Sequence, residues 1–112
     1  MSIEFKKEND IYIIMIRENL SLTNTVEFRK QIVKLIENGV NKIIFDFENA
    51  KYIDSTGITA LLVIHSKMTK KGVRFRITNL KKSVKNIFDI HRLNQILPIS
   101  STTETAISEL NR

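Results

Sequence analysis

The sequence predicts a single α/β domain built on a mixed, mainly parallel sheet of four to five strands, with helices packed on it. The chain has 112 residues, enough for one hydrophobic core. Short apolar runs rich in β-branched residues alternate with longer segments whose apolar residues recur at helical spacing. Such alternation implies parallel strands joined by right-handed crossovers. No repeat, low-complexity tract or linker interrupts the chain, so we expect one domain over residues 1–112.

The order begins with two consecutive strands, which predict an antiparallel hairpin. Ile3 and Phe5 alternate with polar neighbours, which is typical of an edge strand, and residues 6–10 predict a charged turn. Residues 11–16 are apolar on both faces and rich in isoleucine. We therefore expect a central strand there, covered on two sides.

A first helix is expected after a polar connection over residues 17–25. Asn24, with Glu27 three positions later, resembles a capping box. Gly39 is expected to end the helix in a left-handed conformation. The apolar residues at helical spacing, which we expect to be buried, are Val26, Phe28, Ile32, Leu35 and Ile36.

The next unit is a largely apolar strand at residues 43–47, followed by a loop and a helix from about Ser55 to Lys71. Lys71-Gly72 closes this helix. Its expected buried face consists of Ile58, Leu61, Leu62, Ile64 and Met68.

The last third of the chain predicts a shorter strand at 73–77, a helix at 81–90, an extended piece at 96–99 and a terminal helix. Pro98 keeps the extended piece at a sheet edge or outside the sheet. Ser101 to Glu104 resembles a capping box that opens the terminal helix. The whole order is therefore β-β-α-β-α-β-α-β-α. The inward residues expected here are Phe75, Ile77, Val84, Ile87, Phe88, Ala106, Ile107 and Leu110.

Composition restricts the possible functions. No cysteine is present, which excludes disulfides and thiolate chemistry, and the formal charge is +6. The basic residues gather in the second half and could bind nucleic acid. We favour a solvated face and expect no direct nucleic-acid binding, because no aromatic residues are interleaved for stacking. The start of the chain does not resemble a signal peptide and no apolar run could span a bilayer, so we expect a cytoplasmic protein without a membrane partner.

Two loops are the candidates for a site, because ligands and partners meet open α/β sheets beyond the carboxyl ends of the strands. They are residues 17–25 and 48–56. If their strands are neighbours, one polar patch forms. Its expected members are Ser21, Thr23, Asn24, Asp54, Ser55, Thr56 and Gly57.

Ser55 is the most informative member, because it lies where the backbone donors and the positive dipole end of a helix collect. A serine there is accessible to a partner and well placed to carry an anion. The simpler alternative is that Asp54 and Ser55 only cap the helix and Gly57 only allows close packing. Residues alone leave both interpretations open.

Catalytic and metal-binding interpretations have less support. Asp54 to Gly57 is similar to the D-[ST]-G triplet of aspartic proteases, but it has one residue too many before the glycine and its flanks are not all β. His65 and His91 lack ligand partners at i+3 or i+4, so we expect no metal site. No common hydrolase or nucleotide motif occurs. We therefore expect neither catalytic residues nor a cofactor.

Two segments make the sequence similar to STAS domains, in particular the bacterial anti-sigma factor antagonists. Residues 43–58, with IIFDF followed by YIDSTGI, resemble the family's apolar strand ending in Asp and its I/M-D-S-[ST]-G-L segment. Residues 93–99 and 103–106 resemble its closing L-x-x-I/L-F-P-I and T-x-x-E-A-like segments. The likeness covers nearly the whole chain and agrees with the predicted order of elements.

The resemblance implies that Ser55 is a phosphoacceptor with Asp54 as its companion. The implied partners are an anti-sigma factor that is also a serine kinase and a phosphatase that removes the phosphate. In that family the unphosphorylated antagonist binds the kinase and frees the sigma factor, so the resemblance implies that the chain is a kinase substrate and not an enzyme.

One departure concerns the loop after the second strand, where many relatives have G-x-[LI]-D. Glu18 to Ser21 occupies that place, so Ser21 stands where Asp is expected. This difference bears on the efficiency and partner specificity of phosphorylation. Stressosome-type scaffolds and lipid-transport subunits share the fold and remain alternative roles.

Overall fold

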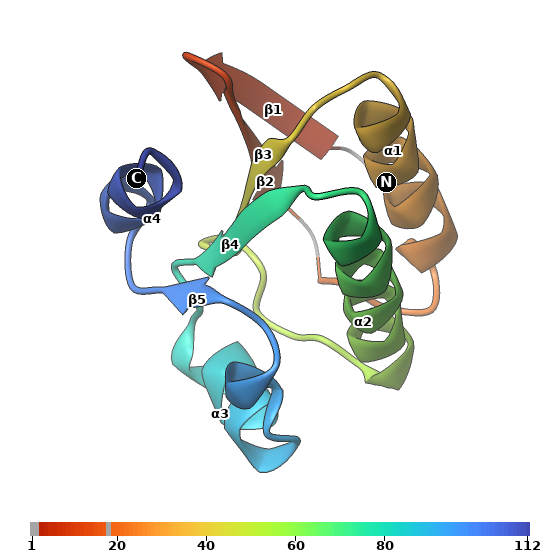
Figure 1. Ribbon diagram of the computed structural model, residues 1–112. Coiled ribbons are helices and arrows are strands. Elements are labelled where there is room, and N and C mark those ends of the chain that lie inside the picture. Colours follow the sequence, from red (N-terminus) through yellow and green to blue (C-terminus); the bar gives the residue numbers. More distant parts are fainter. Residues whose placement is uncertain (1–2, 18) are drawn as a thin grey trace.

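The computed structural model describes residues 3–17 and 19–112 and contains a five-stranded sheet (Figure 1). The strands lie in the order β1-β2-β3-β4-β5. β1 pairs antiparallel with β2, and every following pair is parallel. The predicted fold class and the predicted order of strands and helices are therefore confirmed. The strands are β1 (Ile3–Glu8), β2 (Ile11–Ile16), β3 (Lys42–Asp46), β4 (Arg74–Thr78) and β5 (Ile99–Ser100).

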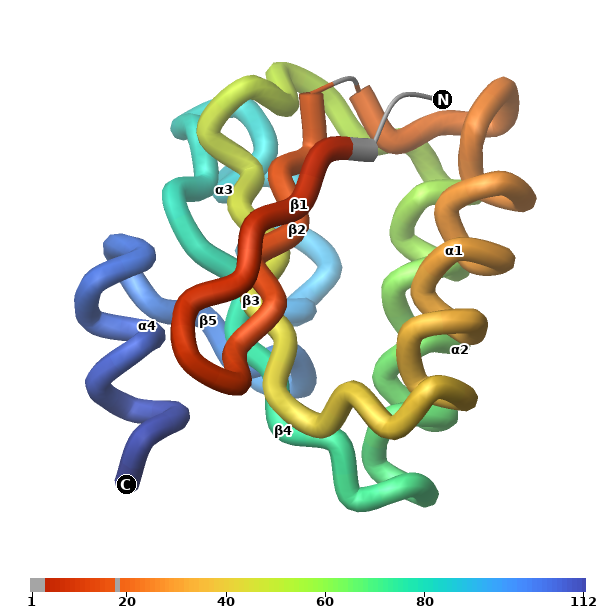
Figure 2. The backbone as a smooth tube through the Cα atoms, turned by 90° about the horizontal axis from the view of Figure 1, so that it is seen from above, coloured from red at the N-terminus to blue at the C-terminus, as the bar shows by residue number. Residues whose placement is uncertain are grey.

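The helices pack on both faces of this sheet (Figure 2). α1 and α2 lie side by side on one face with α3, and α4 lies on the opposite face. They are α1 (Thr25–Glu37), α2 (Ser55–Lys70), α3 (Lys82–Ile90) and α4 (Thr103–Leu110), with a 3₁₀ turn η1 (Leu93–Gln95). No helix in the described part of the chain combines the length and apolar composition that crossing a membrane requires.

The two faces of the sheet bury apolar cores of different size. The larger core lies under α1, α2 and α3 and contains Phe28, Phe45, Phe47 and Phe88. The smaller core consists of Ile11, Ile13, Ile44, Ala106 and Leu110 beneath α4. Because β2 and β3 contribute to both cores, their apolar runs show little alternation, as expected for central strands.

The hairpin differs from its prediction in one respect. Residues 6–8 belong to β1 and are not part of the turn, because Lys6 pairs with Ile13 and Glu8 with Ile11. The turn is confined to Asn9 and Asp10, and Asn9 has a φ of 56°. Asparagine tolerates this left-handed conformation better than most residues, which permits so short a connection.

Burial on α1 also differs from the prediction at its start. Val26 is exposed, whereas Thr25 is buried together with Phe28 and Ile32. The predicted face is therefore correct from Phe28 onward, and only the first turn differs, where Thr25 is buried in place of Val26. Gly39 follows it with a φ of 87°, which confirms the predicted left-handed stop.

The C-terminal segment contains two small corrections. The extended piece begins at Ile99 and not at residue 96, because η1 precedes it, and it forms an edge strand after Pro98 as the proline predicted. The predicted capping box is wrong by one position. Thr102 is the capping residue, and its hydroxyl accepts a hydrogen bond from the Thr105 amide.

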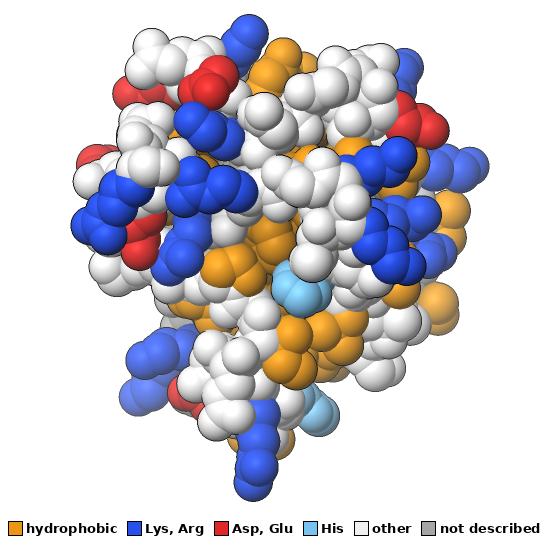
Figure 3. Space-filling view, viewed as in Figure 1, with side chains coloured by type: hydrophobic (Ala, Val, Ile, Leu, Met, Phe, Trp, Pro, Cys, Tyr) orange, Lys and Arg blue, Asp and Glu red, His pale blue; other side chains and the backbone are white. Residues whose placement is uncertain are grey.

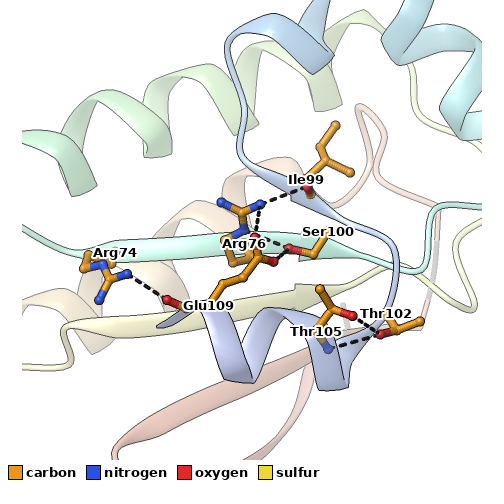
Figure 4. Close-up of polar contacts among 7 residues, drawn as sticks. All are labelled: Arg74, Arg76, Ile99, Ser100, Thr102, Thr105 and Glu109. Carbon is orange, nitrogen blue, oxygen red and sulfur yellow. Dashed lines mark hydrogen bonds and ion pairs between the residues drawn. The ribbon is translucent and has the colours of Figure 1, made fainter. Parts of the chain in front are cut away.

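α4 is attached to the sheet by two arginines of β4 (Figure 4). Arg74 donates hydrogen bonds to the carbonyl oxygens of Leu110 and Glu109, both at 3.0 Å, near the end of the helix. Arg76 forms an ion pair of 3.2 Å with the Glu109 carboxylate and donates to Ser100 at 2.8 Å. These contacts supplement the small apolar core on this face.

Candidate functional site

The two loops predicted to form the site lie side by side. β2 and β3 are parallel neighbours, and the loops after them are joined by a bridge between Leu20 and Ile53. The Leu20 amide donates to the Tyr52 carbonyl, and the Asp54 amide donates to the Leu20 carbonyl, both at 3.2 Å. The polar patch was predicted on the condition that the strands before the two loops are neighbours, and β2 and β3 are neighbours.

Asp54 is the residue that connects the loops to α2. Its Oδ1 accepts hydrogen bonds from the Gly57 amide at 3.0 Å and from the Thr56 hydroxyl at 2.5 Å. Its Oδ2 accepts from the Leu22 amide at 3.1 Å. The Thr56 hydroxyl, and then the Gly57 amide, hold the pKa of the Asp54 carboxyl below its usual value, since both favour the charged form.

Ser55 is the first residue of α2 and is exposed. Its carbonyl accepts a hydrogen bond of 2.9 Å from the Thr59 hydroxyl. Within residues 3–17 and 19–112, its own hydroxyl makes no hydrogen bond. The capping alternative therefore applies to Asp54 and not to Ser55, which is exposed at the helix start.

Gly57 lies where α2 passes closest to the neighbouring loop. A methyl group at this position would lie 2.5 Å from the Leu20 carbonyl oxygen and 2.6 Å from Ile53 Cγ1. Both distances are far below van der Waals contact. The close packing predicted for Gly57 is thus present, although it is made to a loop and not to the sheet.

The loop after β2 is held by a different network from the one predicted. Asn24 precedes α1, but its side chain does not cap the helix. Its Oδ1 accepts from the Ser21 amide at 3.0 Å and its Nδ2 donates to the Asn19 carbonyl at 2.7 Å. The predicted capping box with Glu27 is therefore wrong, because the buried Asn24 amide folds back to brace its own loop.

Ser21 and Thr23 lie together in this loop, with their hydroxyl oxygens 3.1 Å apart. Thr23 is exposed and Ser21 is half-buried. Glu18, the first residue of the segment that departs from the family pattern, lies outside the described residues. The structure thus brings Ser21 and Thr23 into the same surface region as Asp54 and Ser55, whereas the predicted member Asn24 is buried and holds the loop.

Asn19 is a structural residue of the site that the sequence analysis did not identify. Its Oδ1 accepts hydrogen bonds from the amides of Lys51 and Tyr52, both at 2.9 Å. It therefore joins the loop after β2 to the loop after β3. A single asparagine in a polar loop carries no signal of this role, because the partners lie 32 and 33 positions away.

Metal ligation finds no support in the described part of the chain. No group of three or more His, Asp or Glu side chains gathers there in a way that could hold an ion. His65 instead packs edge-on against Phe75, with ring centroids 5.7 Å apart.

The site thus displays an exposed serine at the start of α2, beside the loop after β2. Comparison with known proteins gives the family. The family model described as STAS domain matches residues 2–106. The chain is 28% identical to the anti-sigma-B factor antagonist of Bacillus subtilis (strain 168) over 102 residues, covering 91% of this chain and 92% of that protein.

Two solved structures have the same fold. The tm1081 protein from Thermotoga maritima matches with a TM-score of 0.93 at 23% identity, covering 98% of this chain and 95% of the other. The Bacillus cell fate determinant SpoIIAA in its phosphorylated form matches with a TM-score of 0.73 at 20% identity, covering 97% and 99%. The chain belongs to the STAS domain family, as its sequence pattern predicted.

Proposed function

We propose that the protein is an anti-sigma factor antagonist of the bacterial cytoplasm, switched by phosphorylation at Ser55. In the unphosphorylated state it binds an anti-sigma factor that is also a serine kinase, and so releases a sigma factor. Phosphorylation ends this binding, and a phosphatase restores it. The observation that carries the proposal is the exposed Ser55 hydroxyl at the start of α2, beside the loop after β2. The antagonist relatives give it independent support.

The proposed surface consists of the predicted patch in the two loops. Ser55 would accept the phosphate, while Asp54 and Asn24 would hold the loops in place through their hydrogen bonds to Leu22 and Ser21. The protein would act as a binding partner and kinase substrate, not as the catalyst. The residues are Ser21, Thr23, Asn24, Asp54, Ser55, Thr56 and Gly57.

A phosphate on Ser55 should leave the fold almost unchanged. Phosphoserine adds about −1.5 to −2 charge. At a helix N-terminus such a charge gains roughly 0.3–1 kcal/mol, and repulsion from Asp54 offsets part of that gain. Since the capping bonds are made by Asp54 and not by Ser55, none of them has to break.

The same charge has a much larger effect in a packed interface. Burying a charge without a partner costs several kcal/mol. Each 1.4 kcal/mol corresponds to about a tenfold change in affinity. Phosphorylation would therefore weaken binding by orders of magnitude while stability changes little.

The test begins with capture of the kinase by immobilised Ser55→Ala protein, which should bind it constitutively. The purified kinase and ATP should then place one phosphate on Ser55 of the unaltered chain, located by mass spectrometry of peptides. Ser66→Ala is the matched control, because Ser66 is an exposed serine of the same helix. This variant should be phosphorylated normally, and phosphate found on Thr56 or Ser21 would overturn the assignment.

A phosphomimetic separates binding from folding. We expect Ser55→Asp to keep the circular dichroism spectrum and an unfolding free energy within about 0.5 kcal/mol of the parent protein. Its affinity for the kinase should fall at least about tenfold. Global unfolding, or unchanged affinity in a well-folded variant, would contradict the proposed switch.

A further inference from the structure

A groove runs between the outward faces of α1 and α2, away from the sheet. It has a volume of about 400 Å³. Its apolar lining comes from Val26 and Val33 of α1 and from Val63 and Ile64 of α2. The two helices lie side by side (Figures 1 and 2). The lining of the groove extends along α1 from Val26 to Glu37.

The groove and Ser55 share helix α2. Val63 and Lys67, which line the groove, follow Ser55 further along α2, and the helix rotates by about a third of a turn between Ser55 and Lys67. On the other side, Val26 begins α1 with 54% of its surface exposed, and Leu22, whose amide binds Asp54, is 73% exposed. Both exposed apolar side chains belong to the segment that leads from the loop bound by Asp54 into the first turn of α1.

The rim of the groove is mainly basic. Arg29, Lys30 and Lys67 line it, against the single carboxylate of Glu37. In the described part of the chain, none of these three basic side chains forms an ion pair. Figure 3 shows Lys and Arg side chains gathered over α1 and α2, with apolar side chains between them. An occupant with apolar residues and acidic flanks would complement both features.

We propose that this groove binds an amphipathic helix of the partner protein, with an apolar stripe and acidic flanks. From Val26 to Glu37, which both line the groove, α1 rises about 16 Å, so the occupant would need about three helical turns. The inference rests on the proposed function in taking the occupant to be part of the anti-sigma factor. It adds a second contact region and the chemistry that this region recognises.

The position of Ser55 relates the groove to the switch. Ser55 begins α2, the helix that forms one wall of the groove, so a phosphate there adds negative charge near one end of the groove. Lys67, which lines the groove, attracts the acidic helix. Phosphorylation of Ser55 would therefore weaken two contacts of the partner. At the site loops the cost is desolvation of the phosphate. At the groove it is repulsion of the acidic helix, which is screened over about 8–10 Å at moderate salt.

A designed peptide tests the groove independently of any kinase. The probe is a 16-residue helical peptide with leucines on one stripe and glutamates elsewhere, and its control has lysines in place of the glutamates. In a titration followed by backbone amide NMR, the acidic peptide should shift the signals of Val26, Val33 and Val63. The lysine peptide should not bind.

Charge reversal supplies matched variants. Arg29→Glu/Lys67→Glu should weaken binding of the acidic peptide by about tenfold or more. Lys6→Glu/Arg112→Glu changes the net charge equally at exposed positions outside the groove and should change it less than about twofold. Circular dichroism of both variants establishes that they are folded. Ser55→Asp should weaken peptide binding by a few-fold, in a salt-dependent manner.

The outcomes separate the two proposals. Peptide signals that map elsewhere, absence of binding, or equal loss in both charge-reversal variants would overturn the groove while leaving phosphorylation of Ser55 intact. Failure of any kinase to modify Ser55 would overturn the proposed function while the peptide titration still decides the groove. With the kinase in hand, its affinity for the Arg29→Glu/Lys67→Glu variant should fall in parallel.

Discussion

The start of α2 and the whole of α4 are held in place in opposite ways. At α2 the contacts are short: the Asp54 carboxylate reaches backbone and hydroxyl donors within a few residues and across to Leu22, and Gly57 has no side chain at all. At α4 the contacts are long arginine side chains that extend from β4 to carbonyls and to Glu109 (Figure 4).

The difference is one of rigidity. Short side chains bound to backbone have few rotamers, and a glycine packed against a carbonyl leaves no room for movement. Long side chains have more rotamers to lose and can release a helix locally. The rigid attachment lies beside Ser55, so the backbone of this residue is fixed by contacts that do not involve its own hydroxyl. Three experiments test the difference in rigidity between the start of α2 and α4.

The largest effect is expected for Gly57→Ala. The added methyl group would overlap the Leu20 carbonyl and Ile53, and overpacking of this kind costs typically about 1–3 kcal/mol. Chemical denaturation measures the loss of unfolding free energy. Ser66→Ala, at an exposed position of the same helix, should stay within about 0.5 kcal/mol. A Gly57→Ala protein of unchanged stability would show that the attachment of α2 is not rigid.

A smaller and more local effect is expected for Arg74→Ala. The variant loses the hydrogen bonds to Leu110 and Glu109, worth about 1 kcal/mol in a partly exposed setting. Amide hydrogen exchange should rise across α4 and stay unchanged in α2. Lys70→Ala removes an exposed basic residue elsewhere and serves as the control. Equal acceleration in both helices would mean that α4 does not open independently.

The smallest effect concerns pH. Since folding lowers the pKa of Asp54, its stabilising contribution is complete above the ordinary carboxyl pKa of about 3.9 and is lost as pH falls through the lower folded value. The Leu22 and Gly57 amide signals should titrate together over that acid range. Their titration should vanish in Asp54→Asn and persist in Asp89→Asn, an exposed control on α3. Independent titration of the two amides would show that Asp54 does not join loop and helix.

Much of the fold was predictable because its signals are local. The isoleucine-rich runs of β2 and β3, the helical spacing within α2, and Gly39 after α1 each follow from a few neighbouring residues. The errors also have local causes. Asn24 and Glu27 have the spacing of a capping box, but the Asn24 side chain finds stronger partners in its own loop. Thr102 replaces Ser101 as the cap of α4 because strand β5 continues through Ser100.

The residues of the candidate site were predictable from the sequence, but the structural role of each residue was not. The sequence indicated that Asp54, Ser55 and Ser21 could share one surface, provided that β2 and β3 were neighbours. It could not indicate that Asp54 makes the connecting bonds, that Asn19 joins the two loops, or that Val26 faces outward. Each of these depends on a partner in another element of the fold.

The sequence by itself determined the order of elements, the family and the serine at the start of α2, because these depend on residues adjacent along the chain. The tertiary structure decided which polar side chains of the site are hydrogen-bonded and which are exposed. Asp54 is committed to three donors, one of them 32 residues away, while the neighbouring Ser55 hydroxyl remains exposed. These hydrogen bonds form only when the loops after β2 and β3 come into contact. That contact depends on the pairing of β2 with β3, which are distant in the sequence.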